Sequence, residues 1–478
     1  MIRTRGHSEV VVSGPRWIEA LVIALTLVVG GCGGDAGVAG GADIGGSIFP
    51  DTSAPADTAS GVDAADTAVA ADTAAPDGAD AVDDDAGADA GADLDGDAAT
   101  ADAAVADAVA DSAGPSDTTA DTAPPSIADR CFSGLAGGAP TDLVGPDYDH
   151  IPGLVAGSHC FGTNHQDITD VERVVFLGDS MTVGTPNEEH LLSITNSHFY
   201  RNRLAEWLAD AFALDRGEPV VSWGLWKSYD YATGKGGLRE SGDFANCAKW
   251  GARTDDFLAG GDQIGECFPD GGSAARTLIV FTMGGNDLAA ITQRGGEASA
   301  DEAESGYPSV WALAESAVAY LEEAIVWLKS AEHFPNGSYV VFGNPYEFTD
   351  STGRTDSCTP RASLTIPGVG ELDLSTLGLS VGSIAGFQEW AHPEVQAAIV
   401  VWIMNEYARI VAEHQVDMVW ALERFCGHGY IATGPDADPN NRCYLGPDAE
   451  LWFDVSCIHP NAAGHNALFE MFRAVVEE

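Results

Sequence analysis

The chain has 478 residues, and its 22 Lys and Arg against 73 Asp and Glu give a formal net charge of −51. This balance excludes the basic surface that binds the phosphates of nucleic acids, and it excludes electrostatic attachment to anionic lipid. The acids are unevenly spread. Residues 33–127 contain 21 Asp and no Lys, Arg or Glu, whereas residues 130–478 hold 49 acids and 19 bases. We therefore expect an acidic N-terminal segment followed in the chain by a soluble acidic domain.

The N-terminus is typical of an export signal. A basic start precedes the apolar run 20–31, which ends in Val-Gly-Gly before Cys32. The run is too short to span the hydrocarbon core of a bilayer with ease. Its ending looks like a bacterial lipobox, which implies that residues 1–32 are a lipoprotein signal peptide with lipidation at Cys32. A plain secretory signal and an uncleaved anchor are the alternatives. All three interpretations predict that the protein is exported. With the lipobox, we expect it on the bacterial outer membrane or cell surface, attached to the membrane only by its lipid anchor.

Residues 33–129 indicate a disordered Ala/Asp-rich tether. Phe49 is its only aromatic residue, so little apolar burial can offset the entropy of ordering it. Weak calcium binding by its Asp residues is an alternative, but a solvated spacer fits the composition better.

Eight cysteines remain once Cys32 is assigned to the anchor. An even number in an exported chain predicts disulfides. No two are spaced Cys-x-x-Cys, so we expect neither a zinc site nor another metal. The sequence leaves the connectivity open; pairing of neighbours would join 131–160, 247–267, 443–457 and 358–426. The candidates are Cys131, Cys160, Cys247, Cys267, Cys358, Cys426, Cys443 and Cys457.

From residue 173 onward, short β-branched runs alternate with amphipathic stretches. This alternation predicts an α/β domain over 130–478 with a five-stranded parallel sheet covered on both faces, and with 130–172 as an N-terminal extension. Ligands of such sheets bind beyond the carboxyl ends of the strands. The expected strands are 173–177, 219–223, 277–282, 338–342 and 416–420, and the expected helices are 199–214, 310–328, 395–414 and 462–476.

The first strand runs into Gly178-Asp179-Ser180. A serine at a strand-to-helix turn lies where free backbone N–H groups receive negative charge, so Ser180 is a candidate nucleophile. The same residues also form ordinary turns and helix caps.

Three further motifs follow strands or precede the last helix. Asn286, after Gly284 and Gly285, offers an amide donor, although a helix cap would explain it equally well. Gly251 offers an unhindered N–H in a loop. His459 is followed by Pro460, which fixes the backbone after it. Together these residues supply a nucleophile, a base and three oxyanion donors, as acyl transfer requires.

In this order the four blocks resemble the SGNH (GDSL-type) hydrolases over residues 173–478. The resemblance implies a flavodoxin-like three-layer α/β/α sandwich and ester hydrolysis without a cofactor. Ser180 would then attack the carbonyl carbon and His459 would remove its proton. The Ser180 and Gly251 N–H groups and the Asn286 side chain would hold the oxyanion.

One position departs from this family. The Asp that orients the histidine normally lies three residues before it, and here that residue is Ser456. Asp454 is the nearest acid. Either Asp454 reaches the imidazole through a longer turn, or a backbone carbonyl holds the ring, or the site is weakened.

Two other clusters have residues that suit ligand sites. The aromatic residues Trp223, Trp226, Tyr229 and Tyr231 suit either a sugar or acyl groove or a loop packed by its own rings. The run 436–441 has the alternating oxygens of a calcium loop without the Gly and Glu of an EF-hand, which indicates a turn.

The sequence therefore predicts an exported, surface-tethered serine esterase that acts as a monomer on carboxylic esters, either acetylated glycans or short-chain lipid esters. A non-catalytic glycan-binding surface protein and an O-acyltransferase are the alternatives. The expected partner is a small-molecule or polysaccharide ester, and no nucleic acid.

Overall fold

The computed structural model describes most of the chain after residue 123. The expected signal peptide, Cys32 and Cys358 lie outside the described residues, as does nearly all of the expected tether. The described residues are 124–135, 145–185, 197–346, 348–354, 363–366, 370–373, 388–435, 437–454 and 456–478. Helix α2 (Ile127–Phe132) begins before the expected boundary at 130, because the Ser126 hydroxyl accepts the Asp129 N–H and caps it.

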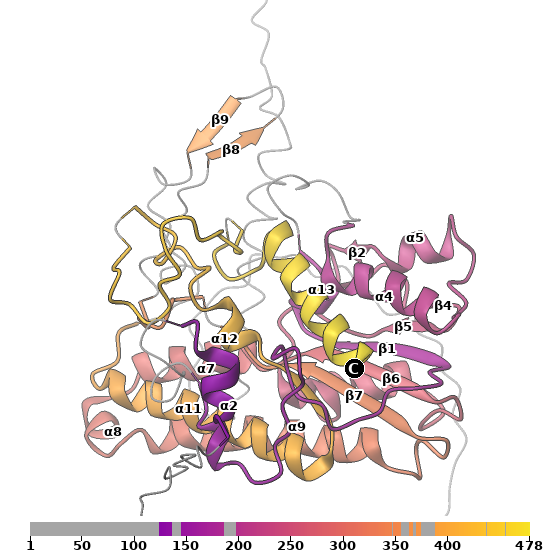
Figure 1. The fold of residues 1–478 in the computed structure, drawn as a ribbon, viewed down its shortest axis with the longest axis horizontal. Coiled ribbons are helices and arrows are strands. Elements are labelled where there is room, and N and C mark those ends of the chain that lie inside the picture. Colours follow the sequence, from indigo (N-terminus) through magenta and orange to yellow (C-terminus); the bar gives the residue numbers. More distant parts are fainter. Residues whose placement is uncertain are drawn as a thin grey trace, which may run out of the picture. The chain divides into compact units, whose positions relative to one another are not determined.

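The central sheet has six strands in the order β10-β7-β6-β1-β5-β4 (Figure 1). Five of them run parallel, as predicted, and β4 joins the edge antiparallel to β5. The strands are β1 (Arg173–Gly178), β4 (Glu240–Ser241), β5 (Phe244–Asn246), β6 (Thr277–Thr282), β7 (Ser338–Gly343) and β10 (Asp417–Val419). Two small antiparallel pairs are β2 (Tyr229–Asp230) with β3 (Lys235–Gly236), and β8 (Ser363–Ile366) with β9 (Gly370–Asp373).

Alternate residues of β1 fill two separate cores. Val175 and Leu177 pack under α7 (Gly285–Gly296), α9 (Pro308–Lys329) and α11 (Pro393–His414). Val174 and Phe176 pack under α4 (Tyr200–Ala211), α5 (Ser222–Trp226) and α13 (Ala462–Glu477). Figure 1 shows these helices on opposite sides of the sheet, which gives the predicted three layers. The shorter helices are α3 (Ser180–Val183), α6 (Gln263–Cys267), α8 (Ala300–Glu304), α12 (Ala421–Phe425) and the 3-10 turns at Tyr148–His150 and Thr254–Phe257.

The predicted strand 219–223 is wrong. The chain forms helix α5 there, and Val220 is 83% exposed instead of buried. Trp223 and Trp226 stack with ring centroids 4.8 Å apart, a contact that a helix makes at i,i+3 and a strand does not. Both rings pack on Phe244, which belongs to β5. It is β5 that occupies the predicted strand's place beside β1.

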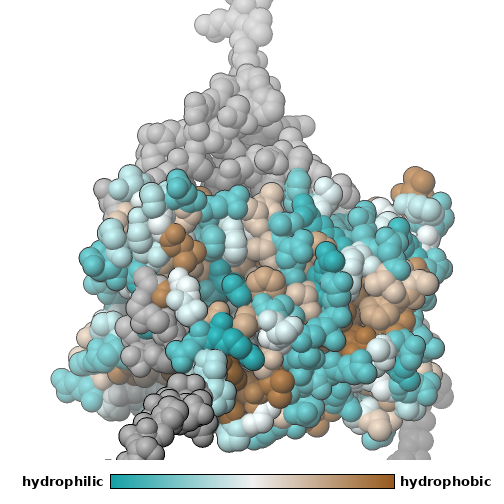
Figure 2. All heavy atoms as spheres, in the orientation of Figure 1, coloured by the Kyte–Doolittle hydropathy of each residue, from teal (hydrophilic) through white to brown (hydrophobic). Residues whose placement is uncertain are grey.

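Helix α11 is long and apolar enough, by length and composition, to cross a membrane. It packs instead against α7, α9 and β10 and buries Ile399, Ile403 and Tyr407 in the core, so we interpret it as a core helix. The view in Figure 2 is mostly hydrophilic, with apolar side chains gathered in small areas. The exposed large apolar residues are Val155, Val220, Val221, Leu225, Leu313, Tyr320, Val326 and Leu445.

Three disulfides join described cysteines: Cys131–Cys160, Cys247–Cys267 and Cys426–Cys443. Cys457 is also disulfide-bonded. The first two pairs are as expected. The expected pairs 443–457 and 358–426 are wrong, because the segment between Cys426 and Cys443 folds back on itself and brings their Cα atoms to 4.9 Å.

A buried carboxylate organises that segment. Asp350 is fully buried with φ +48°, and its two oxygens accept four backbone N–H groups at 2.8–3.1 Å. The donors are Gly427, Gly429, Ile431 and Ala432, and we call this carboxylate with its four donors the Asp350 cradle. Each would lack this partner if the carboxylate were removed, and buried unpaired N–H groups are costly.

We expect Asp350→Asn to lower the free energy of unfolding by at least about 2 kcal/mol, because an amide replaces one acceptor oxygen with a donor that faces other donors. Chemical denaturation of the oxidised protein measures the change. Asp438→Asn, at an exposed acid in the same segment, is the control and should change little. Equal stability of both variants would show that the cradle contributes nothing.

Candidate active site

The turn after β1 presents Ser180. Gly178 has φ +120°, and a Cβ there would lie 2.3 Å from the Thr282 carbonyl oxygen, so only glycine fits. The next residue, Asp179, caps α3 by accepting the Met181 N–H at 3.0 Å and the Thr282 hydroxyl at 2.9 Å. Ser180 is therefore the first residue of α3, half-buried and fixed by the two residues before it.

Two buried acids tie neighbouring loops together. Burial raises the pKa of Asp179 to about 7 and that of Asp287 to about 6. Asp287 accepts the Thr254 N–H at 3.1 Å and the Thr254 hydroxyl at 2.9 Å, which joins α7 to the loop after Gly251. These carboxyl groups are engaged by donors, so we assign them to holding the loops.

The Ser180 Oγ lies 2.9 Å from the His459 Nε2, although the two residues are 279 positions apart. His459 belongs to a short loop that is closed by the Phe453–Pro460 bridge and by the bond from the Asp454 N–H to the His459 carbonyl, at 2.9 Å. Its imidazole is buried, and this desolvation lowers its pKa to about 4. At neutral pH the ring is uncharged and Nε2 can accept the Ser180 proton.

The Ser456 hydroxyl lies between Asp454 and His459. It is 3.0 Å from the His459 Nδ1, and it donates to the Asp454 Oδ1 at 2.5 Å. The three ways of holding the imidazole that the sequence suggested did not include this bridge. The residue that departs from the family pattern is the one that touches the ring.

The predicted oxyanion donors meet at the same sheet edge. The Lys249 N–H donates to the Gly178 carbonyl at 3.0 Å, and the Asn286 Nδ2 donates to the Ala252 carbonyl at 2.9 Å. These bonds bring the loop of Gly251, which has φ +73°, beside the ends of β1 and β6. Among the described residues, the N–H groups of Ser180 and Gly251 make no hydrogen bond.

The aromatic residues near this edge divide into two groups. Trp223 and Trp226 are core residues. Tyr229 is buried against Tyr231 and Trp250, with ring centroids 5.1 and 5.6 Å away. The Trp250 indole N–H donates to the Gly184 carbonyl at 2.9 Å. The loop is thus packed by its own rings, and half-buried Tyr231 and Trp250 are the members nearest to solvent.

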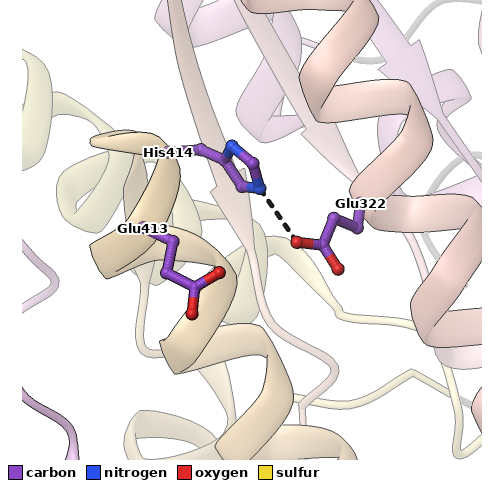
Figure 3. Close-up of side chains that lie close together, drawn as sticks. All are labelled: Glu322, Glu413 and His414. Atoms are coloured by element: carbon purple, nitrogen blue, oxygen red, sulfur yellow. Dashed lines mark hydrogen bonds and ion pairs between the residues drawn. The ribbon is translucent and has the colours of Figure 1, made fainter.

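Within the described ranges, one group of metal-ligand type gathers at Glu322, Glu413 and His414 (Figure 3). His414 Nε2 lies 2.9 Å from Glu322, whose two oxygens also accept both terminal nitrogens of Arg409 at 3.1 and 2.8 Å. Arg409 bonds Glu413 as well, at 2.7 Å. Hydrogen bonds from Arg409 lower the pKa of Glu322 to about 2. A guanidinium already balances these acids, which indicates an ion-pair network between α9 and α11.

In the calcium-like run, Asp436 lies outside the described residues. Asp438 Oδ1 accepts both the main-chain and side-chain N–H groups of Asn440, at 2.8 and 2.9 Å, which is a turn as predicted.

Sequence reasoning missed several supports of the site. Gln263 donates to the Gly178 carbonyl at 2.9 Å and accepts the Gly178 N–H at 2.8 Å, which fixes the end of β1. The Tyr430 hydroxyl donates to the Asp454 carbonyl at 2.7 Å, and the Tyr346 hydroxyl donates to the Ile458 carbonyl. No sequence pattern marks these residues, because each acts on the main chain of a distant segment.

No family model and no curated protein matches the chain. Among solved structures it is similar to phospholipase A1 from Streptomyces albidoflavus, with 17% identity, a TM-score of 0.34, and coverage of 64% of this chain and 99% of that one. It is also similar to an extracellular lipase from Streptomyces rimosus, with 18% identity, a TM-score of 0.34, and coverage of 64% and 100%. An alpha/beta hydrolase from the metagenome of Lake Arreo, Spain, gives 14% identity, a TM-score of 0.28, and coverage of 64% and 95%. At these TM-scores the similarity does not support a conclusion about function.

We expect the His459 imidazole to titrate near pH 4 instead of 6.5, because burial disfavours its charged form. The unfolded chain then binds more protons between these pH values, so this group's contribution to stability is present above 6.5 and is lost as pH falls toward 4. His465, also buried, contributes in the same direction. The individual imidazole resonances should therefore be followed by NMR, with His459→Gln as the assignment control. A His459 pKa at or above 6.5 would contradict the buried, neutral ring.

Proposed function

We propose that the chain is a serine esterase that hydrolyses carboxylic esters through an acyl-enzyme at Ser180. The observation that carries the proposal is the 2.9 Å contact between the Ser180 Oγ and the Nε2 of a buried, neutral imidazole. A hydroxyl is a weak nucleophile until an adjacent base removes its proton, and this geometry supplies the base. The resemblance of the four sequence blocks to SGNH hydrolases supports the same chemistry.

In the proposed reaction Ser180 Oγ attacks the ester carbonyl carbon while its proton moves to the His459 Nε2. The C–O bond to the alcohol then breaks, and the alcohol leaves with the proton from Nε2. Water then attacks the acyl carbon while its proton moves to the His459 Nε2, the bond from that carbon to the Ser180 Oγ breaks, and the carboxylic acid leaves. The proton returns to Ser180, so the two half-reactions leave the protein unchanged.

The negative charge on the carbonyl oxygen needs hydrogen-bond donors beside it. Among the described residues, the N–H groups of Ser180 and Gly251 make no hydrogen bond, and the Asn286 amide, which donates to the Ala252 carbonyl, is held next to the Gly251 loop. Donors fixed in advance cost no reorganisation when the charge develops. For this reason such donors usually contribute more to the rate of acyl transfer than any other single feature of a site.

We further propose that the protein is exported and anchored through Cys32. The disulfides fit an oxidising compartment, and the acidic residues 33–127 would hold the domain away from a like-charged surface. For the substrate we propose short acyl esters, on a glycan or a small lipid.

Ser180→Ala should abolish hydrolysis of p-nitrophenyl acetate and butyrate, a loss of at least about 10⁴-fold in kcat, since the nucleophile is removed. The oxidised full-length protein is assayed against Ser316→Ala, an exposed serine on α9, as the matched control.

Activity of Ser180→Ala equal to that of Ser316→Ala would contradict the proposal. Folded protein without activity on any ester, but with retention on a glycan column, would favour the binding-protein alternative. Acyl product found on an added glycan acceptor in excess of that released to water would favour an acyltransferase.

Asn286→Ala should lower kcat by about 10²–10³-fold with little change in KM, because its donor is needed when the oxyanion forms. Gln293→Ala on the same helix is the control for damage to α7. Denaturation midpoints show whether loss of the Asn286 bond to Ala252 destabilises the loop. A change in KM alone would remove Asn286 from the oxyanion site.

A further inference from the structure

The protons of the loop before α13 can be placed by elimination. The Asp454 carboxylate only accepts, and its Oδ1 takes the Ser456 N–H at 2.8 Å and the Ser456 hydroxyl at 2.5 Å. The single hydroxyl proton of Ser456 is thereby used. Its Oγ, 3.0 Å from the His459 Nδ1, must then accept from Nδ1–H. His459 is left with a bare Nε2, facing Ser180.

We propose that Ser456 is a positioning residue that connects Asp454 to His459, so that the serine hydroxyl does through one extra hydrogen bond what the Asp of the family does directly. This inference rests on the proposed esterase activity. It assigns Ser456 two tasks: to fix the Nδ1–H tautomer of the imidazole, and to transmit the negative charge of Asp454 to the ring when it becomes protonated.

The loop holds Ser456 in place from both ends. The Ser456 Oγ also accepts the His459 N–H at 3.1 Å, so the hydroxyl and the ring belong to one tight turn. Cys457, which is disulfide-bonded, has φ +65° at the corner of that turn. Bonds from Tyr430 and Tyr346 to the carbonyls of Asp454 and Ile458 clamp the loop from outside.

We call the hydrogen-bonded chain Asp454–Ser456–His459 the relay. No proton leaves the relay during the reaction. When Ser180 Oγ bonds to the carbonyl carbon, its proton goes to Nε2 and the ring becomes an imidazolium. The Nδ1–H then points at the Ser456 oxygen, and the Ser456 O–H still points at Asp454. Both bonds strengthen when the ring carries charge, because charge-assisted hydrogen bonds are stronger than neutral ones. The relay therefore acts more on the transition state than on the ground state.

In the described part of the chain, two elements outside its own loop face the imidazole. Ser180 approaches it from α3, and His465 approaches it from α13 as a buried ring of lowered pKa. Asp454, through Ser456, supplies the negative charge on its own loop. Loss of the relay should thus move the acid limb of kcat/KM to lower pH, because the imidazolium loses its stabilising charge.

The test compares Ser456→Ala and Asp454→Asn with Tyr430→Phe. The last variant removes another hydrogen bond from the same loop and leaves the relay intact. The relay predicts that each of the first two lowers kcat by about 10²-fold with KM little changed. The variant that combines Ser456→Ala and Asp454→Asn should be no less active than either single variant. The acid limb of kcat/KM should move to lower pH in both single variants and in the double variant, but not in Tyr430→Phe.

Two rescues make the test specific. Ser456→Thr keeps the hydroxyl and should keep most of the activity. Ser456→Asp combined with Asp454→Asn places one carboxylate directly against the ring and should recover most of what either single relay variant loses. Additive losses, an unmoved acid limb, or equal effects in Tyr430→Phe would overturn the relay and leave Ser456 a structural residue.

The esterase proposal and the relay fail in different ways. If the wild type hydrolyses no ester, the first fails, and the relay is then tested in Ser180→Ala by NMR. The His459 Nδ1–H resonance should lie downfield with Ser456 present and be lost in Ser456→Ala, while the imidazole pKa falls. An unchanged resonance would overturn the relay whatever the activity.

Discussion

The position of β1 in the middle of the sheet is the constraint on which the other parts depend. Its residues pair with β5 on one side and with β6 on the other, and their side chains fill both cores. A strand held on four sides cannot slip in register without moving every side chain to the wrong face. The turn at its carboxyl end is therefore fixed in space, and Ser180 with it. The Lys249 N–H joins the Gly251 loop to that same end, and Asn286, at the start of α7, is joined to this loop through the Ala252 carbonyl.

Much of this arrangement could be read from the residues. The β-branched runs of β1, β6 and β7 and the long helices α9, α11 and α13 were predicted almost to the residue, because each has a strong period and clear ends. The error at 219–223 arose because Trp223, at the end of this apolar run, packs at helical spacing on Trp226, which lies beyond the run. The strand that replaces it, β5, has three residues and no pattern of its own. Short central strands of this kind are defined by their neighbours.

The residues of the candidate site likewise divide into those that sequence motifs predict and those that they do not. Ser180, Gly251, Asn286 and His459 follow recognisable motifs, and the structure brings them to one edge. The relay could not be predicted, because position 456 carries a hydroxyl where the family pattern has a carboxylate. The role of Ser456 depends on the direction of the Asp454 side chain, in a loop that is closed by the Phe453–Pro460 bridge. Hydrogen bonds made by distant tyrosines to main-chain carbonyls leave no trace in local sequence.

The Asp350 cradle has a consequence for how the chain folds. Its carboxylate joins a segment after β7 to N–H groups roughly eighty residues later, and the Ser180 contact with His459 closes an even longer loop. Contacts of such separation form late, since the entropy of closing the intervening chain is lost before they contribute. The two parts of the site should therefore meet only after both cores have condensed. On the proposed export route, a chain that folds in this order would not yet have the Ser180–His459 contact while it crosses a membrane.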